Sequence, residues 1–228
     1  MSRVAETDIP EYVDRFFREH GPGRMRLVAM TYQFDPEVFE VRFDRIFRRG
    51  GMRVDVVIGE EADKIRRAQY RIWRANWPGT FHPKLMILLA NCRVAVGLGS
   101  ANLTSGGLGG NLECWHFLED RAADRRVLAG VRRFLLEMVR KGILSQHLRI
   151  EEVISALPPA DAGAVMSTLY GPLVNQVAEK VRGSVKRLDI LSPVNCKPER
   201  ALRKILDLTE ARAVHLYTNM RTVPAIKG

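Results

Sequence analysis

The sequence predicts an α/β fold built on a mixed β-sheet flanked by helices, and three observations predict it. Residues 26–59 follow the order strand, helix, strand, which is typical of a parallel βαβ unit. Residues 84–99 contain two apolar runs joined by the short polar link Ala90-Asn91-Cys92, which indicates a hairpin of two buried strands. Residues 124–142 carry the apolar and basic spacing of an amphipathic helix.

The βαβ unit follows a short helix expected at residues 9–20, which a Gly-Pro-Gly sequence ends. Its strands, 26–32 and 52–59, are apolar and partly β-branched, as buried strands are. Its helix, 35–51, opens with an Asp-Pro pair that suits the N-cap and the first helical position. Two glycines close this helix, so both of its ends are marked in the sequence.

A further helix is expected at residues 60–76, just ahead of the hairpin. Its basic residues fall at spacings of three and four and would share one face: Lys64, Arg67, Arg71 and Arg74. Such a stripe is either a solvated helix face or, with the tyrosine and tryptophans interleaved in it, a track for a nucleic-acid backbone. These four residues are therefore candidate substrate-binding residues.

After the hairpin the sequence predicts a glycine-rich loop at 104–110, a strand at 112–118, the helix at 124–142 and a kinked helix at 165–183. The tail then repeats the plan of the βαβ unit, a strand opening with Arg-Leu, a Pro-Glu helix start, a basic-apolar helix and a second strand. The interval from Arg26 to Val54 differs by a single position from the interval between Arg187 and Val214. We therefore expect two domains, a first lobe at 1–183 and the beginning of a second lobe at 184–228.

Composition narrows the function. The 228 residues carry a net charge of +10, which favours a polyanionic partner such as nucleic acid or an acidic membrane surface, although solubility alone could account for it. The three cysteines form no C-x-x-C pair, so we expect no zinc site, no disulfide framework and no metal or other cofactor. The N-terminus has no apolar signal-peptide core, and no apolar run approaches the ~20 residues of a membrane span. These features favour a cytoplasmic protein.

Polar residues stand at the ends of the two hairpin strands. His82 and Lys84 are two apart at the start of one strand, and Ser100 and Asn102 are two apart at the end of the other. Since residues i and i+2 of a strand point to the same side, all four would meet at one end of the sheet. A nucleophile, a fixed cation and two hydrogen-bond donors around one point suit a tetrahedral anion, and phosphoryl transfer is the matching reaction class.

Each group has an expected role in that chemistry. Neutral His82 would attack phosphorus and form a phosphohistidine, while Lys84 would neutralise the non-bridging oxygens. Ser100 and Asn102 would donate hydrogen bonds to those oxygens, although Ser100 could also be a plain turn residue. Glu113 would accept a hydrogen bond from the second ring nitrogen of His82, or else is an ordinary surface carboxylate. Gly99 and the glycines after Asn102 would let the backbone approach the phosphate closely.

These residues resemble the phospholipase D superfamily, whose pattern is H-x-K-x4-D followed by G-S-x-N. His82-Pro83-Lys84 and Gly99-Ser100-Ala101-Asn102 match, whereas Leu89 occupies the Asp position. The tyrosyl-DNA phosphodiesterase branch also lacks that Asp. In that branch an asparagine, and then a Glu or Gln, follow the histidine at the same spacings as Asn102 and Glu113 follow His82 here.

Two longer stretches extend the resemblance. The sequence TYQFDPEVFE is similar to the segment that opens the first lobe of the tyrosyl-DNA phosphodiesterases, whereas GSANLTSGGL is more like the bacterial HKD-family nucleases and the phospholipase D-type restriction enzymes. The likeness spans roughly residues 25–120, about two fifths of the chain. It implies a phospholipase D-like fold and a metal-independent phosphodiesterase acting on DNA, in restriction or in DNA repair.

The resemblance also implies a second H-x-K motif, from a second lobe or from a homodimer mate, because one histidine attacks while the other protonates the leaving oxygen. None of the other histidines is followed by x-Lys: His20, His116, His147 and His215. The interval from Gly59 to His82, counted onward from the corresponding Asn219, ends beyond residue 228. We therefore expect the second half of the active site in a missing C-terminal part, with a single-motif homodimer as the alternative.

Two other function classes stay open at this point. A phospholipase or phosphatidyltransferase would use the same chemistry, although no membrane-facing amphipathic segment stands out. A non-catalytic nucleic-acid-binding module would bind DNA in a salt-dependent way without turning it over.

Overall fold

The computed structural model divides the chain into two compact units, Met1–Val165 and Met166–Gly228. It describes the residues 8–21, 23–60, 69–111, 113–159, 165–171, 173–180, 186, 188–192, 203, 206, 207, 209, 210 and 213–218.

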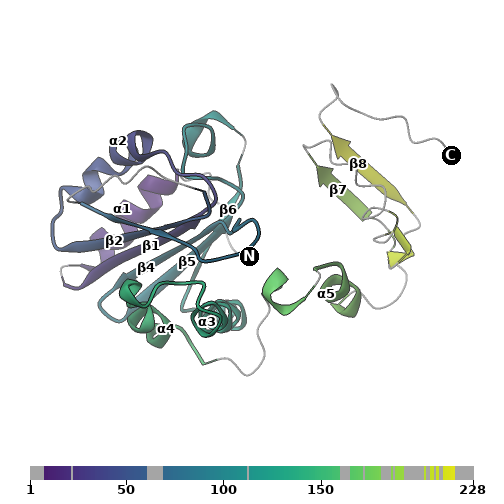
Figure 1. Cartoon of the computed structure of the whole chain (residues 1–228). Helices are drawn as coiled ribbons and strands as arrows, with labels where there is room; N and C mark the ends of the chain where they lie inside the picture. The colour runs from purple at the N-terminus through teal and green to yellow at the C-terminus, as the bar shows by residue number, and fades with distance from the viewer. Residues whose placement is uncertain are drawn as a thin grey trace. The chain divides into compact units, whose positions relative to one another are not determined.

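The first unit is a sheet with helices on both faces (Figure 1). Its strands are β1 Met25–Thr31, β2 Met52–Ile58, β3 Arg71–Arg74, β4 Leu85–Ala90, β5 Arg93–Gly99 and β6 Trp115–Glu119. Its helices are α1 Ile9–His20, α2 Pro36–Phe47, α3 Arg125–Arg140 and α4 Glu151–Ala156, with a π-helical turn η1 Gly106–Gly110 and a 3-10 turn η2 Gln146–Leu148. Helices α1 and α2 cover one face of the sheet, and α3 and α4 cover the other (Figure 1).

The strand order is β3-β2-β1-β4-β5-β6. Strands β1, β2 and β3 run parallel, while β4 is antiparallel to β1 and to β5, and β5 is antiparallel to β6. The predicted mixed sheet flanked by helices is therefore confirmed, and so are the parallel βαβ unit and the hairpin. The hairpin turns at Asn91, which adopts a left-handed conformation with φ 54°, as short hairpin turns require.

Helix α2 begins where the sequence predicts it. The Asp35 side chain accepts hydrogen bonds from the backbone N–H groups of Glu37 and Val38, and Pro36 fills the first helical position. These bonds satisfy two of the donors that a helix N-terminus leaves open.

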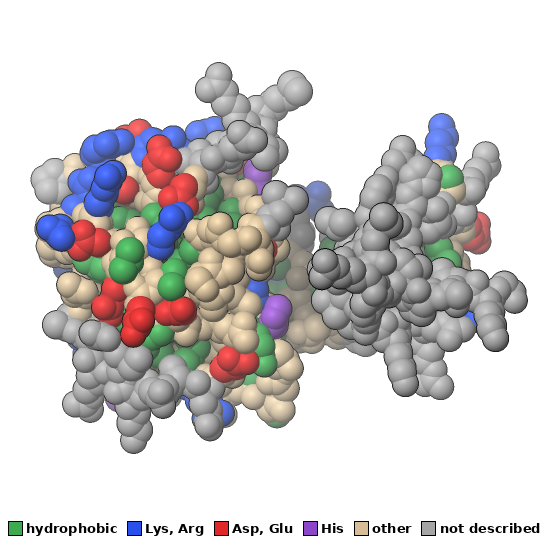
Figure 2. Space-filling model, turned by 90° about the horizontal axis from the view of Figure 1, so that it is seen from above, with side chains coloured by type: hydrophobic (Ala, Val, Ile, Leu, Met, Phe, Trp, Pro, Cys, Tyr) green, Lys and Arg blue, Asp and Glu red, His purple; other side chains and the backbone are tan. Residues whose placement is uncertain are grey.

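The α2 side of the unit carries both basic and acidic side chains on its surface (Figure 2). In the view of Figure 2, Lys and Arg side chains are interspersed there with Asp and Glu, and ion pairs such as Arg42–Asp8 and Arg48–Asp44 join them.

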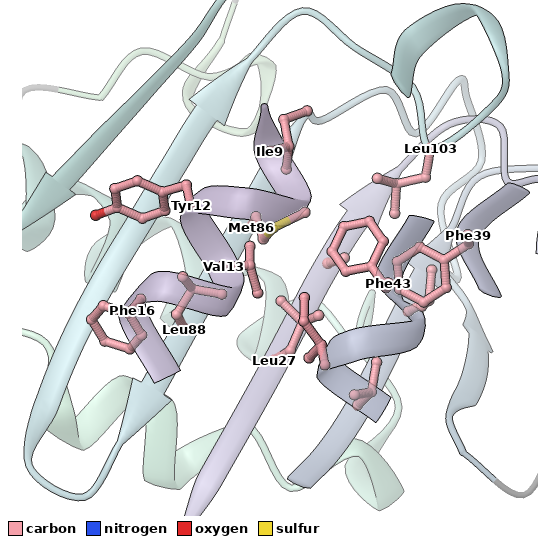
Figure 3. Close-up of a cluster of buried hydrophobic side chains, with 14 of the residues drawn as sticks. Ile9, Tyr12, Val13, Phe16, Leu27, Phe39, Phe43, Met86, Leu88 and Leu103 are labelled. Atoms are coloured by element: carbon pink, nitrogen blue, oxygen red, sulfur yellow. The ribbon is translucent and has the colours of Figure 1, made fainter. Parts of the chain in front are cut away.

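Both faces of the central strands are buried, which explains why their sequences are continuously apolar. In β1, Leu27 and Ala29 belong to the cluster beneath α1 and α2, while Val28 and Met30 alternate with them on the opposite face. Figure 3 shows part of the first cluster, which includes Phe16, Phe39 and Phe43 packed over the sheet.

One ion pair lies inside this apolar environment. The guanidinium of Arg26 donates to the Asp55 carboxylate at 3.0 and 3.2 Å, and their side chains are 4% and 0% exposed. Asp55 also accepts from Arg53 at 2.8 Å and from the indole N–H of Trp73 at 2.9 Å. Arg26 donates in addition to the carbonyls of Leu148 and Arg149, so the network fastens the segment between α3 and α4 to the sheet.

The helix expected at 60–76 is wrong over its last part. Residues 71–74 form β3, which pairs in parallel with β2 from Asp55↔Arg71 to Ile58↔Arg74. Ile72 and Trp73 favour a strand, and pairing with the open edge of β2 decides in its favour. The glycine-rich loop also differs, because it closes into the π-helical turn η1 through the bond from Gly110 N to Ser105 O.

The second unit contains a 3-10 turn η3 Thr168–Tyr170, helix α5 Leu173–Lys180, and strands β7 Leu188–Ser192 and β8 Val214–Thr218. The expected continuous helix at 165–183 is thus broken, and Gly171, with φ 116°, stands at the break. Strands β7 and β8 pair in parallel with Leu188 opposite Val214, as β1 and β2 pair with Met25 opposite Met52. Across the described residues of both units, no helix is long and apolar enough to cross a bilayer.

Candidate functional site

The candidate site lies at the edge of the sheet where β1, β2, β3 and β5 end and where β4 and β6 begin. The parallel strands β1 and β2 end there, and the antiparallel register places Met30 opposite Leu85 and Leu85 opposite Leu98. The start of β4 therefore lies beside the ends of β1 and β5. The start of β6 joins them, because Gly99 is opposite Trp115.

His82 and Lys84 stand at the start of β4 and lie side by side. The Lys84 ammonium is 3.2 Å from Nδ1 of His82 and 3.3 Å from Nε2. The Lys84 backbone carbonyl accepts a hydrogen bond of 3.1 Å from the N–H of Gly99, so β5 holds the lysine in place. The two-residue spacing thus brings the predicted nucleophile and the predicted cation together, as the sequence indicated.

The environment lowers the pKa of both groups. Partial burial, followed by the charge of Lys84, lowers the pKa of His82 below its ordinary 6.5, which favours the neutral imidazole that a nucleophile requires. Burial lowers the pKa of Lys84 to about 8, and the carboxylate of Glu113 partly opposes that shift. Around neutral pH the site therefore combines a neutral imidazole with a lysine that still carries its charge.

Asn102 follows β5 and is held by the end of β1. Its Oδ1 accepts hydrogen bonds from the Thr31 hydroxyl at 3.2 Å and from the Gln33 N–H at 3.3 Å. Its Nδ2 donates to the side-chain oxygen of Gln33 at 3.4 Å. Among the glycines of the following turn, Gly107 packs on the backbone of Asn102, because a Cβ there would lie 2.0 Å from the Asn102 carbonyl oxygen.

Ser100 and Glu113 form a pair of their own. The Ser100 hydroxyl donates to a Glu113 carboxylate oxygen at 2.5 Å and accepts from the N–H of Cys114 at 3.0 Å. The expected hydrogen bond from His82 to Glu113 does not occur in this part of the chain, where the ring nitrogens of His82 contact Lys84 instead. Glu113 acts on the site through the Lys84 charge.

Gly99 has a packing role. A Cβ at this position would lie 2.4 Å from the indole ring of Trp115, which covers it from the neighbouring strand. The need for glycine here thus comes from the aromatic neighbour as well as from any close approach of a ligand.

The structure does not support the basic stripe as a helix face. Arg71 and Arg74 lie on β3 and, being three residues apart on a strand, point to opposite faces of the sheet. Lys64 and Arg67 lie outside the described residues. Of the two described arginines, Arg74 is at the end of β3 that faces the site edge, because it pairs with Ile58 at the end of β2.

Sequence reasoning missed several residues at this edge. Thr31 and Gln33 contact Asn102, and the ring of Tyr32 lies 4.9 Å from the His82 ring, between centroids. The carboxylate of Glu60 interacts with the Tyr32 hydroxyl and raises the pKa of the tyrosine. The TYQFDPEVFE stretch was the available signal, since its first three residues are the ones that reach the site.

No group of three or more His, Cys, Asp or Glu side chains with the arrangement of a metal site occurs among the residues that the structure describes.

No family model matches the chain, and a search of curated proteins finds no match. Solved structures to which it is similar include three proteins of 14–18% sequence identity. The first is the polyphosphate kinase from Porphyromonas gingivalis, at 14% identity, TM-score 0.42, covering 57% of this chain and 20% of that one. NucT from Helicobacter pylori matches at 15% identity and TM-score 0.36 over 50% of this chain and 79% of that one. Nuc from Salmonella typhimurium, a phospholipase D family member, matches at 18% identity and TM-score 0.34 over 54% of this chain and 80% of that one. The chain thus spans a fifth of the polyphosphate kinase and about four fifths of the two shorter proteins.

Proposed function

We propose that this chain carries the nucleophile half of a metal-independent phosphodiesterase of the phospholipase D superfamily that acts on DNA. The observation that carries the proposal is the contact of the Lys84 ammonium with the His82 ring at 3.2 Å, at a strand edge that also holds the Asn102 amide. A cation against a neutral imidazole suits attack on an anionic phosphodiester, because the cation draws the phosphate toward the nucleophile. The net charge of +10 supports a polyanionic substrate, and nucleic acid is the one we propose.

In the proposed reaction a ring nitrogen of His82 attacks phosphorus in line with the leaving oxygen. The nitrogen–phosphorus bond forms as the bond to the leaving oxygen breaks, and that oxygen takes a proton from an acid on the opposite side. Lys84 neutralises the non-bridging oxygens, and the Asn102 N–H₂ donates to one of them. Water then attacks the phosphohistidine, giving its proton to the same opposite group, and releases the phosphate monoester and free imidazole.

The proton donor is proposed to come from a second H-x-K half, because His82 cannot both attack and protonate the leaving oxygen. The parallel pairing of β7 with β8, with Leu188 opposite Val214 as Leu27 is opposite Val54 in β1 and β2, supports the second unit as part of such a half. A second copy of the chain, with two His82 side chains across a dimer axis, is the other source of the acid.

Cleavage of DNA by the full-length protein in the presence of EDTA tests the proposal. His82→Ala should abolish cleavage, while His147→Ala, which changes an exposed histidine of η2, should leave it intact. Activity that strictly requires Mg²⁺ would contradict the mechanism. Lipid turnover without DNA cleavage would instead indicate a phospholipase, and salt-dependent DNA binding without turnover would indicate a binding module.

A nuclease and an enzyme that cleans 3′ ends differ in the leaving group. A 3′-phosphotyrosyl oligonucleotide and a plain duplex of the same sequence, compared at equal concentration, separate these two uses of the site. Preference for the tyrosyl substrate indicates end processing, and preference for the duplex indicates a nuclease.

A further inference from the structure

The residues Thr31, Tyr32 and Gln33 lie between His82 and Asn102 of the candidate site. Thr31 is the last residue of β1, the strand that joins the parallel and antiparallel parts of the sheet, and Tyr32 and Gln33 follow it directly. Thr31 and Gln33 contact Asn102, which follows β5, and Tyr32 contacts His82, which precedes β4. One short segment thus touches both the proposed nucleophile and the proposed hydrogen-bond donor.

The contacts of Thr31 and Gln33 fix the orientation of the Asn102 amide. The Gln33 N–H donates to the Asn102 Oδ1, and the Thr31 hydroxyl directs a shared hydrogen to the same oxygen, so the oxygen end of the amide faces the protein. The N–H₂ group is left to donate, with one of its hydrogens directed to the Gln33 side chain at 3.4 Å. Thr31 is itself held, because its one hydroxyl hydrogen is shared between the Asn102 Oδ1 and the nearer Gln33 carbonyl at 2.8 Å, and its oxygen accepts from the N–H of Leu103 at 3.3 Å.

Tyr32 restricts the His82 ring from one side, with the two rings inclined at 42°. Gly59 allows this close approach. A Cβ at Gly59 would lie 3.0 Å from the Tyr32 ring and 2.3 Å from the carbonyl oxygen of Phe81, the residue before His82. Backbone bonds from the Gly59 N–H to the carbonyls of Thr31 and Tyr32, at 3.1 and 3.3 Å, keep the end of β2 in this position.

We propose that Thr31, Tyr32 and Gln33 are positioning residues that hold His82 and Asn102 in their reactive orientations. Tyr32 acts through the His82 ring, and Thr31 and Gln33 act through the Asn102 amide. The inference rests on the proposed function for its catalytic consequence, whereas the contacts themselves can be measured without turnover. None of the three residues belongs to the H-x-K and G-S-x-N elements.

Imidazole proton shifts of His82 test the Tyr32 contact directly in the 228-residue chain. The signals are assigned by their loss in His82→Ala, and Tyr32 ring currents should displace them from random-coil values. Tyr32→Phe keeps the ring and should keep the displacement, whereas Tyr32→Leu should remove it. Equal His82 shifts in wild type and Tyr32→Leu would overturn the contact, whatever the activity of the protein.

Steady-state kinetics of the full-length protein test the consequence. Thr31→Val keeps the shape of a buried side chain but removes the hydroxyl that holds Asn102, so kcat should fall about tenfold with KM little changed. Thr31→Ser keeps the hydroxyl and should recover most of kcat. Tyr32→Ala should lower kcat similarly, and Tyr32→Phe should restore it because the ring is what acts.

The two levels of failure are distinguishable. Wild-type protein without any phosphodiesterase activity would remove the proposed function, while the shift measurement would still decide the His82 contact. An active wild type with unchanged kcat in both Thr31→Val and Tyr32→Ala would overturn the positioning role alone. A fall in kcat that the conservative variants Thr31→Ser and Tyr32→Phe fail to rescue would also overturn it.

Discussion

The charge of Lys84 sets a pH limit on the proposed reaction. Burial lowers the pKa of this lysine to about 8, and only the ammonium form can neutralise the phosphate oxygens. At pH 9, one unit above that pKa, about a tenth of the molecules keep the charge. We therefore expect kcat/KM to fall roughly tenfold per pH unit once the pH is well above 8, on the condition that the lysine is required.

The acid side of the profile follows from His82. The attacking imidazole must be neutral, and partial burial with the neighbouring charge of Lys84 lowers its pKa below 6.5. Activity should rise as the pH passes upward through that lowered pKa, which lies below 6.5. The expected profile of kcat/KM is a bell whose alkaline limb begins near pH 8.

Two variants assign the alkaline limb to Lys84. The Glu113 carboxylate raises the pKa of Lys84, so Glu113→Gln should move the alkaline limb to lower pH. Lys84→Arg places a group there that stays protonated, so the part of the limb that Lys84 contributes should disappear, while any limb of the opposite acid should stay. Glu60→Gln, which changes a carboxylate that acts on Tyr32, serves as the matched control and should leave the limb in place.

The assay is kcat/KM for DNA cleavage by the full-length protein between pH 5 and 10 at constant ionic strength, which keeps DNA binding comparable. A wild-type profile that stays flat to pH 10 would refute the assignment of the cation. An unchanged alkaline limb in Glu113→Gln would refute the electrostatic link between the carboxylate and the lysine.

Three further predictions concern stability and binding. Asp55→Ala leaves the buried Arg26 without its carboxylate partner and should lower the free energy of unfolding in urea by about 3–5 kcal/mol. Asp44→Ala, at an exposed ion pair, should lower it by about 0–1 kcal/mol, and similar losses in both variants would contradict the buried network. Gly107→Ala forces a Cβ against the backbone carbonyl of Asn102, so it should lower the free energy of unfolding by about 1–3 kcal/mol and reduce kcat. A variant with wild-type stability and wild-type kcat would contradict this prediction. Arg74→Ala should weaken DNA binding and reduce the slope of log affinity against log salt concentration by about 1, whereas Arg48→Ala on the α2 side should leave the slope unchanged. Equal slopes for wild type and Arg74→Ala would show that β3 is not part of the binding surface.

Much of the first unit could be predicted because its elements carry local signals. The Asp-Pro start of α2 and the alternation of apolar runs with short polar links depend on neighbouring residues alone, and the structure has them where the sequence indicates. The helix prediction for residues 71–74 was wrong because the basic residues there suit the solvent side of a helix equally well. These residues form a strand because they pair in parallel with the open edge of β2, from Asp55↔Arg71 onward. The pairing partner is distant in the sequence, so the segment alone does not reveal it.

The candidate site shows the same division. His82 and Lys84 are two positions apart in the sequence and contact each other, so their spacing was sufficient to predict the pair. The residues that hold Asn102 are 71 and 69 positions away along the chain, and no periodicity in one sequence connects such positions. The partner of Glu113 was missed for a related reason, since the turn between Asn102 and β6 decides which side chain the carboxylate meets.

The central claim is that His82 becomes covalently bound to phosphorus. Full-length protein mixed in excess with DNA, quenched in alkali within a single turnover and digested with protease and nuclease, should give a peptide containing His82 that carries a phosphoryl group still esterified to a nucleoside, since a phosphoramidate survives alkali. Lys84→Gln should retain the adduct at a reduced rate, and His82→Ala should lack it. Cleavage of DNA with no adduct on the His82 peptide, or with the adduct on Ser100, would contradict the account.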